Sequence, residues 1–136
     1  MASMQYDVET FMRMCGQEVK THPEAPSAEI VTLRKNLIYE EVMGLGELFD
    51  SMDKGDLVGI ADGIADVLYV VLGTAAAYGI DAQACFDEAH RSNMTKATWD
   101  ERTQTFVVIK REDGKILKPD TFVPADFGKV LKELEC

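Results

Sequence analysis

The stretch IADGIADVLYVVLGTAAAYGI, residues 60–80, decides the fold class. Its only charged side chains are those of Asp62 and Asp66, and residues 67–80 form an uncharged run of 14. A helix that crosses a bilayer needs roughly 20 apolar residues, so this run is too short for a membrane span. Gly79 is well placed to end a helix in the left-handed conformation. The stretch therefore predicts a helix buried inside a soluble protein or at a subunit interface, with no membrane partner.

Apolar residues at helical spacing continue on both sides of this stretch. They predict helices over residues 5–15, from Ser27 to about Met52, from Asp56 to about Tyr78, from Asp81 to about Arg91, and over 125–134. The β-branched run TFVVI (105–109) and the Asp113-Gly114 turn before KILK predict a small hairpin. We expect an all-α fold, an antiparallel helical bundle with a small C-terminal β-hairpin. One domain would cover 1–136, with a helical core over about 5–96 and the hairpin and tail over 103–136.

The acidic composition limits the classes of molecule that the protein can bind. The 136 residues include 24 Asp and Glu but only 14 Lys and Arg, a net charge of −10. So acidic a chain is repelled by a nucleic-acid backbone and by an anionic membrane, which argues against both as partners. A small anion can still bind if a metal ion lies between it and the protein. The three cysteines fit no zinc pattern and no signal peptide is visible, so we expect a cytoplasmic protein.

Carboxylates lie on the apolar faces of two of these helices. On a helix that continues from Ser27, Glu41 would lie about 20° from Leu48, inside the apolar stripe, with Glu40 at its edge. Asp62 and Asp66 are four residues apart, so they share one face of the next helix. Burying unpaired carboxylates costs several kcal/mol each, and like charges raise one another's pKa. A compensating group is therefore expected beside these acids.

A divalent cation is the simplest such group, because Mg²⁺ takes oxygen ligands and is often held by a few carboxylates and substrate phosphates. The sequence predicts a Mg²⁺ site, with Mn²⁺ as the second candidate. Its ligands would be Glu40, Glu41, Asp62 and Asp66, with Glu47 as a further candidate. In the alternative reading, Glu40 and Glu41 begin an exposed turn, and Asp66 pairs with Arg34 or Lys35.

Cationic and amide side chains follow the fourth predicted helix, in the segment HRSNMTK (90–96). Arg91, Asn93 and Lys96 are suited to hold phosphate, sugar or base, as is Lys118 in the hairpin. The alternative is a solvated helix end, where cations favour the helix dipole, and an ordinary hairpin lysine. No glycine-rich phosphate loop and no nucleophilic triad can be assembled from the spacing.

Taken in order, these segments resemble the MazG-like nucleotide pyrophosphohydrolases, and more closely the small proteins labelled phosphoribosyl-ATP pyrophosphohydrolase-like. The resemblance covers about Tyr6 to Leu131. It is carried by LIYEEV (37–42), GLGEL (44–48), IADGIADVLYVVLGTAAAYGID (60–81), FDEAHRSNMTK (86–96) and DGKILKPDTFVPADF (113–127).

The resemblance implies a bundle of the MazG-like type that is completed by oligomerisation, as a homodimer or homotetramer. It also implies Mg²⁺-dependent cleavage of a nucleoside triphosphate into the monophosphate and pyrophosphate. Glu40, Glu41 and Asp66 match the family's metal motif, whereas Gly44 and Gly63 stand where two further acids are expected. The neighbouring acids Glu47 and Asp62 are the candidates to replace them. Asn93 and Lys96 match the family's substrate-binding segment.

The residues and the resemblance together predict a hydrolase in which a metal-activated water attacks the α-phosphorus. Glu40 and Glu41 are the predicted catalytic residues, with Glu40 as the general base. Arg91, Asn93, Lys96 and Lys118 are the predicted contacts to the substrate. Because Gly44 and Gly63 interrupt the motif, two alternatives stay open. One is a catalytically weakened or inactive nucleotide-binding or regulatory protein of the same fold, and the other is a purely structural oligomer.

Overall fold

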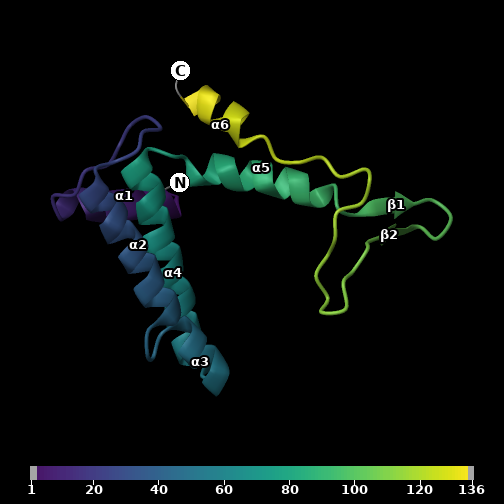
Figure 1. The fold of residues 1–136 in the computed structure, drawn as a ribbon, viewed down its shortest axis with the longest axis horizontal. Helices are drawn as coiled ribbons and strands as arrows, with labels where there is room; N and C mark the ends of the chain where they lie inside the picture. The colour runs from purple at the N-terminus through teal and green to yellow at the C-terminus, as the bar shows by residue number, and fades with distance from the viewer. Residues whose placement is uncertain (1–2, 135–136) are drawn as a thin grey trace. The chain divides into compact units, whose positions relative to one another are not determined.

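The computed structural model describes residues 3–134 and confirms a mostly helical fold with a small hairpin near the C-terminus. The chain divides into two compact units, of which the first ends at Ala82 and the second begins at Gln83. The first unit contains α1 (Met4–Met14), α2 (Ala28–Met43), α3 (Leu48–Lys54) and α4 (Leu57–Tyr78) (Figure 1). The second contains α5 (Ala82–Met94) apart from its first residue, β1 (Thr98–Asp100), β2 (Thr105–Val107) and α6 (Phe127–Leu134).

Helix α4 is the centre of the first unit and contacts each of the other three helices. Helices α2 and α4 lie side by side, and α3 packs beside the first part of α4 (Figure 1). Val8 and Met12 of α1 are buried against Ala76 and Ala77 of α4. Alanines on α4 let α1 approach closely, so the core depends on small residues as much as on large ones.

The helix ends follow the predicted capping residues. The Ser27 hydroxyl accepts a hydrogen bond from the Ile30 amide, and the Asp56 carboxylate accepts one from the Gly59 amide. Gly79 adopts the left-handed conformation at φ +68° and ends α4 as predicted.

The predicted helix from Ser27 to Met52 is wrong in one respect, because it is two helices. Helix α2 ends at Gly44, Gly46 has φ +76°, and α3 starts after Glu47 as its N-cap residue. Leu45, between the two glycines, is 95% exposed and therefore belongs to no apolar stripe. The Asp50 carboxylate accepts a hydrogen bond from the Gly46 amide at 2.9 Å and fixes the turn. Two glycines in three residues weaken a helix enough for this turn to replace it.

The C-terminal hairpin is present, but its strands differ from the predicted pair. Thr105–Val107 pairs antiparallel with Thr98–Asp100, so that Trp99 lies opposite Phe106. Their rings meet edge to face, with centroids 5.1 Å apart. The Asp113-Gly114 turn closes only one isolated bridge, between Lys110 and Ile116. The aromatic pair explains this choice, because cross-strand aromatic contacts stabilise a register that KILK cannot match.

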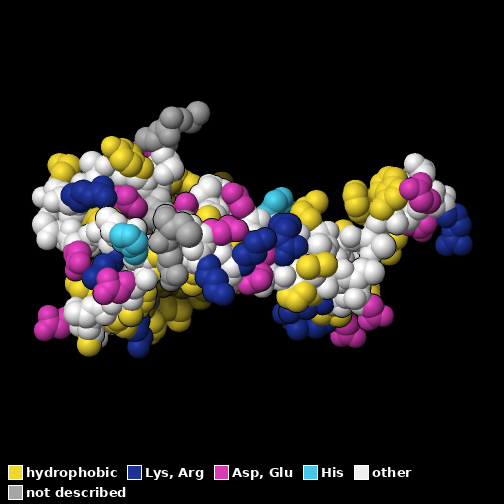
Figure 2. All heavy atoms as spheres, turned by 90° about the horizontal axis from the view of Figure 1, so that it is seen from above, with side chains coloured by type: hydrophobic (Ala, Val, Ile, Leu, Met, Phe, Trp, Pro, Cys, Tyr) yellow, Lys and Arg dark blue, Asp and Glu magenta, His cyan; other side chains and the backbone are white. Residues whose placement is uncertain are grey.

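Much apolar surface of α4 stays uncovered. Within the described part of the chain, α4 alone is long and apolar enough to cross a membrane, by length and composition, and only 11% of that window is buried. Leu57 and Val58 are 79% and 81% exposed. Figure 2 shows apolar side chains lying open on the surface among the charged ones. So large an uncovered surface on one helix is typical of a face that another molecule covers.

Candidate metal centre

Three carboxylates from three helical elements converge in the first unit. Glu41 lies on α2, Glu47 caps α3, and Asp66 lies on α4. Each offers an oxygen, and these three oxygens lie within 4.8 Å of one another, with all three residues half-buried. The pKa of Glu41 is raised, first by burial and then by the negative charges of Asp66 and Glu47. The cluster therefore has the oxygen donors of a hard-cation site and the repulsion that a cation would relieve.

The two glycines that interrupt the expected motif allow this convergence. A Cβ on Gly44 would lie 2.8 Å from the Glu47 Cγ, and one on Gly63 would lie 2.9 Å from the Leu48 Cα. A side chain at Gly63 would therefore push away the start of α3, and one at Gly44 would collide with the Glu40 carbonyl and displace the Glu47 side chain. Glycine at both positions lets α3 begin against α4 and lets the Glu47 side chain cross the end of α2.

The structure brings together only part of the predicted ligand set. Glu41 and Asp66 meet in the cluster, and Glu47, the further candidate, joins them. Glu40 and Asp62 are exposed and lie outside this cluster of three, although the charge of Glu40 also raises the pKa of Glu41. The helix break explains the difference, since a straight helix would have carried Glu47 two turns beyond Glu40.

The alternative pairing of Asp66 with Arg34 or Lys35 is not formed among residues 3–134. Arg34 is only 6% exposed and instead bonds to α4. Its Nη2 donates to the Val70 carbonyl at 3.0 Å and its Nε donates to the Thr74 hydroxyl at 3.2 Å. Burial lowers the pKa of Arg34.

Arg34 was not predicted as a core residue, yet it ties α2 to α4. The residue lies seven positions before Glu41, and its acceptor Val70 lies four positions after Asp66. It therefore fixes the two helices that carry these acids within two turns of the cluster. Gly73 makes room for the guanidinium, since a Cβ there would lie 3.1 Å from the Arg34 Cζ. A glycine inside an apolar helix was the available sequence signal.

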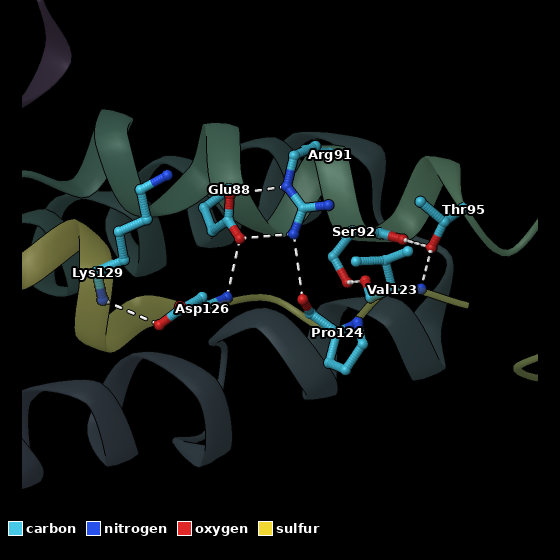
Figure 3. A network of polar contacts seen from close by, with 8 residues as sticks. All are labelled: Glu88, Arg91, Ser92, Thr95, Val123, Pro124, Asp126 and Lys129. Carbon is cyan, nitrogen blue, oxygen red and sulfur yellow. Dashed lines mark hydrogen bonds and ion pairs between the residues drawn. The ribbon is translucent and has the colours of Figure 1, made fainter. Parts of the chain in front are cut away.

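The predicted substrate residues lie in the second unit, and Arg91 is held in a network there (Figure 3). Its Nε donates to Glu88 at 2.9 Å, and its Nη2 donates to Glu88 at 2.6 Å and to the Pro124 carbonyl at 3.1 Å. Such a bidentate pair fixes the guanidinium. These contacts favour a structural role for Arg91, which is to hold the segment before α6 against α5.

The other three predicted substrate residues are placed differently. Asn93 is exposed on the last turn of α5. The ammonium nitrogens of Lys96 and Lys118 lie 6.0 Å and 5.1 Å from the ring centroid of Phe122. The structure therefore brings the two lysines to one aromatic side chain, which the sequence did not predict.

The network around Glu88 predicts a response to acid. The Arg91 guanidinium, together with the Asp126 amide, lowers the pKa of Glu88 from 4.5 to about 2. The stabilisation is therefore complete above the ordinary pKa and is lost as the pH falls from about 4.5 towards 2. We expect the protection of the Val123 and Asp126 amides, which NMR measures as their hydrogen-exchange rate relative to the intrinsic rate at each pH, to fall over this range.

Glu88→Gln is the control for this response. It should lower the protection of the same amides at neutral pH and remove the pH dependence of that protection between 4.5 and 2. Exchange at Val123 and Asp126 that is equally slow in the variant would contradict the assigned role of Glu88.

A comparison with known protein families places the cluster within a family match. The family model for phosphoribosyl-ATP pyrophosphohydrolase matches residues 8–93, which run from α1 into the last turn of α5 and include all three carboxylates of the cluster. A search of curated proteins gave no match. The match confirms the resemblance and points to a pyrophosphohydrolase, a hydrolase of phosphorus anhydrides. The chain therefore belongs to the phosphoribosyl-ATP pyrophosphohydrolase family.

Proposed function

We propose that this protein is a metal-dependent nucleoside triphosphate pyrophosphohydrolase, which converts an NTP or dNTP and water into the monophosphate and pyrophosphate. One observation carries the proposal: Glu41, Glu47 and Asp66 converge within the part of the chain that matches the family. A pyrophosphohydrolase must stabilise charge on the phosphates, and three clustered acids can do so only through a cation.

The three carboxylates fit Mg²⁺, with Mn²⁺ as the second candidate. Hard cations take oxygen ligands, and the three donor atoms within 4.8 Å of one another are close enough to share one ion. Glu41, Glu47 and Asp66 would hold it. When bound, such an ion neutralises phosphate charge and lowers the pKa of a coordinated water.

The remaining roles are assigned to side chains outside the cluster. Glu40 is exposed beside Glu41 and is our candidate for the base that takes the proton of the attacking water. Asp62 lies one turn before Asp66 and is the second candidate for this base. Asn93, Lys96 and Lys118 stay the proposed substrate contacts. Arg91 supports their unit through Glu88.

The test is a panel of NTPs and dNTPs with Mg²⁺, with Mn²⁺ or with EDTA, and with products separated by ion-exchange chromatography. We expect monophosphate and pyrophosphate with either metal and no turnover with EDTA. Release of orthophosphate would contradict the proposed cleavage site. Nucleotide binding without turnover would support the alternative, a nucleotide-binding or regulatory protein of the same fold.

Replacing Glu47 tests whether the structural cluster, rather than the set predicted from sequence, holds the metal. Glu47→Gln is expected to weaken Mg²⁺ binding by about tenfold or more, because it removes one of three converging charges. Asp62→Asn is the matched control and should change the affinity by less than about threefold, since Asp62 lies outside the cluster. Isothermal titration with MgCl₂ measures both. A larger loss of Mg²⁺ affinity in Asp62→Asn than in Glu47→Gln would instead support the ligand set predicted from the sequence.

The protein is also proposed to associate with itself through α4. Apolar residues follow one another on α4 at alternating spacings of four and three, as in the seam of a coiled coil. They are Leu57, Ala61, Ile64, Leu68, Val71 and Ala75. The large members are 43–79% exposed in the single chain. A second copy offers the same seam, so the pairing is self-complementary and gives a homodimer or, by pairing of dimers, a homotetramer.

Leu68→Glu is expected to convert the oligomer into a monomer, because it places a charge in the centre of the seam. The mass is measured by light scattering after size exclusion. Val58→Glu is the control, since Val58 is exposed on α4 but outside the seam. A wild-type protein that is monomeric at about 100 µM would contradict this pairing.

Covering α4 in this way removes the apolar surface that a membrane would otherwise take. We therefore propose a cytoplasmic protein, in the host cytoplasm if it is phage-encoded, with no membrane and no nucleic-acid polymer among its partners.

A further inference from the structure

We propose that Asp50 is a positioning residue for the candidate metal centre, because its carboxylate holds the turn that carries Glu47 into the cluster. The Asp50 Oδ2 accepts a hydrogen bond from the amide of Gly46, the residue directly before Glu47, at 2.9 Å. Asp50 itself lies outside the cluster of three acids. The inference rests on the proposed function, since it names a residue on which the same cation site depends.

Glu47 occupies a helix position that its side chain does not serve. It is the N-cap residue of α3, yet its side chain makes no capping hydrogen bond. Shorter polar side chains are preferred at an N-cap, because they reach the first amides of the helix. The Glu47 side chain instead lies against the end of α2, where its Cγ would be 2.8 Å from a Cβ on Gly44. Its carboxylate is therefore left for the cluster.

The turn before Glu47 is held on both sides of one peptide residue. Gly46 has φ +76°, a conformation that glycine adopts without strain. Its amide donates to the Asp50 carboxylate, and its carbonyl accepts from the Ser51 hydroxyl at 3.4 Å. The bond to Asp50 is the shorter of the two and has a charged acceptor, so it is the stronger. Asp50 therefore contributes most to fixing this glycine.

The Asp50 contact is a variant of a common helix-start motif. In a capping box, an acidic side chain at the third helical position accepts a hydrogen bond from the amide of the N-cap residue. Asp50 is the third residue of α3, but it bonds the amide one residue earlier. The Glu47 amide is thereby left to donate to the Gly44 carbonyl at 3.1 Å, which ties Glu47 to the end of α2.

The helix that carries Asp50 is itself fixed against α4. Ser51 is only 3% exposed, and a Cβ on Gly59 of α4 would lie 2.5 Å from its hydroxyl oxygen. The Ser51 carbonyl also accepts a hydrogen bond from the Asp56 amide at 3.0 Å, directly before α4. Since α4 supplies Asp66 to the cluster, the turn held by Asp50 is placed relative to another acid of the same cluster.

A lysine keeps the Asp50 carboxylate ionised and offsets its charge. The Lys54 ammonium lies 2.7 Å from the same Oδ2, one turn further along α3. The Lys54 ammonium, and after it the Gly46 amide, lower the pKa of Asp50, so its carboxylate is ionised at neutral pH. Because the pair is nearly neutral, Asp50 adds little net charge near the cluster. Its effect on a bound cation is therefore geometric rather than electrostatic.

Titration of the full chain with MgCl₂ by calorimetry tests this role. Asp50→Ala should weaken Mg²⁺ binding by about tenfold, because the turn that presents Glu47 is released. Asp50→Asn should stay within about threefold of the wild type, since its amide oxygen still accepts from Gly46. Asp53→Ala is the matched control, because it removes an exposed acid from the same helix, and it should change the affinity by less than about twofold.

A double-mutant cycle shows whether Asp50 acts through Glu47. In the Glu47→Gln background, Asp50→Ala should change the remaining Mg²⁺ affinity by less than about twofold, because the carboxylate that it places is already gone. A further tenfold loss in that background would overturn the inference. Equal losses in Asp50→Ala and Asp50→Asn would also overturn it, because they would indicate an effect of charge alone.

A measurement in EDTA separates this inference from the proposed function. The close approach at the end of α2 predicts a nuclear Overhauser cross-peak between the Gly44 Hα and the Glu47 Hγ protons. The cross-peak should disappear in Asp50→Ala and persist in Asp50→Asn and Asp53→Ala. If the wild type binds no cation, the proposed function fails, and the cross-peak still tests the placement of Glu47. An unchanged cross-peak in Asp50→Ala would overturn the inference even if Mg²⁺ binds.

Discussion

Replacing Glu41 with glutamine is expected to lower the rate of pyrophosphate release from a nucleoside triphosphate by at least about 100-fold. The amide keeps the shape of the side chain but removes a charge that faces Asp66 and Glu47 in the cluster. With two carboxylates left, a divalent cation loses a ligand at the point where three elements meet. Asp66→Asn should have an effect of the same order. A coupled assay for pyrophosphate measures both rates.

The control for this change is Glu29→Gln, in the first turn of the same helix. Glu29 is exposed and lies outside the cluster, so its variant should keep the rate within about twofold. Rates that fall equally in both variants would mean that the cluster is not the catalytic centre.

The melting temperature in the absence of metal is a second measurement that distinguishes Glu41→Gln from the wild type. Burial and the neighbouring acids raise the pKa of Glu41 in the folded protein, so its ionised form destabilises the fold. This destabilisation is absent below the ordinary pKa and grows as the pH rises through the raised one. At neutral pH in EDTA, the variant should therefore melt at the wild-type temperature or above it. Added Mg²⁺ should raise the melting temperature of the wild type and have much less effect on the variant.

Gly79→Ala is expected to lower the free energy of unfolding by about 3 kcal/mol or more. Gly79 has φ +68°, which is unfavourable for alanine, and the new Cβ would also lie against the backbone carbonyl of His22. The loop cannot withdraw without loss. The Lys20 amide donates to the Ala76 carbonyl at 3.0 Å, and the Glu24 amide donates to the Tyr78 carbonyl at 2.9 Å. These bonds satisfy carbonyls at the end of α4.

Gly55→Ala separates the collision from the backbone conformation. Gly55 ends α3 with φ +65°, and a Cβ there would meet nothing within 4 Å. It should therefore show only the conformational cost, about 1 kcal/mol. Urea unfolding followed by circular dichroism compares the two variants. Equal losses would mean that the contact with His22 contributes nothing.

Capping residues and apolar spacing were sufficient to predict most helices. Ser27 and Asp56 precede the first residues of α2 and α4, and Gly79 follows the last residue of α4. Each of these helix ends depends on one local side chain or one local conformation. The break between α2 and α3 could not be predicted in the same way. Leu37 and Leu48 keep a helical spacing across it, so periodicity does not reveal that the helix stops. The hairpin register depended on the contact of Trp99 with Phe106, which is not a local signal.

For the candidate site, the sequence predicted that carboxylates from two helices gather, but it predicted only part of the cluster that the structure shows. Acids on apolar faces indicated a cation site, and Glu41 and Asp66 do converge. Glu47 replaces Glu40 and Asp62 in the cluster because the turn at Gly44 changes the direction of the chain after α2. Which of several neighbouring acids face one another is decided by the packing of α3 on α4 at Gly63, a contact between segments that no spacing rule describes.

The fit of Arg34 against Gly73 has an evolutionary consequence. The guanidinium occupies the volume that a methyl group at position 73 would fill, so neither residue can change alone without loss. Relatives with a larger residue at 73 should carry a shorter, uncharged one at 34, and the two positions should covary across an alignment. The double variant Arg34→Leu with Gly73→Ala should accordingly be more stable than Gly73→Ala alone. Substitutions in α2 and α4 are therefore expected to have accumulated together during evolution.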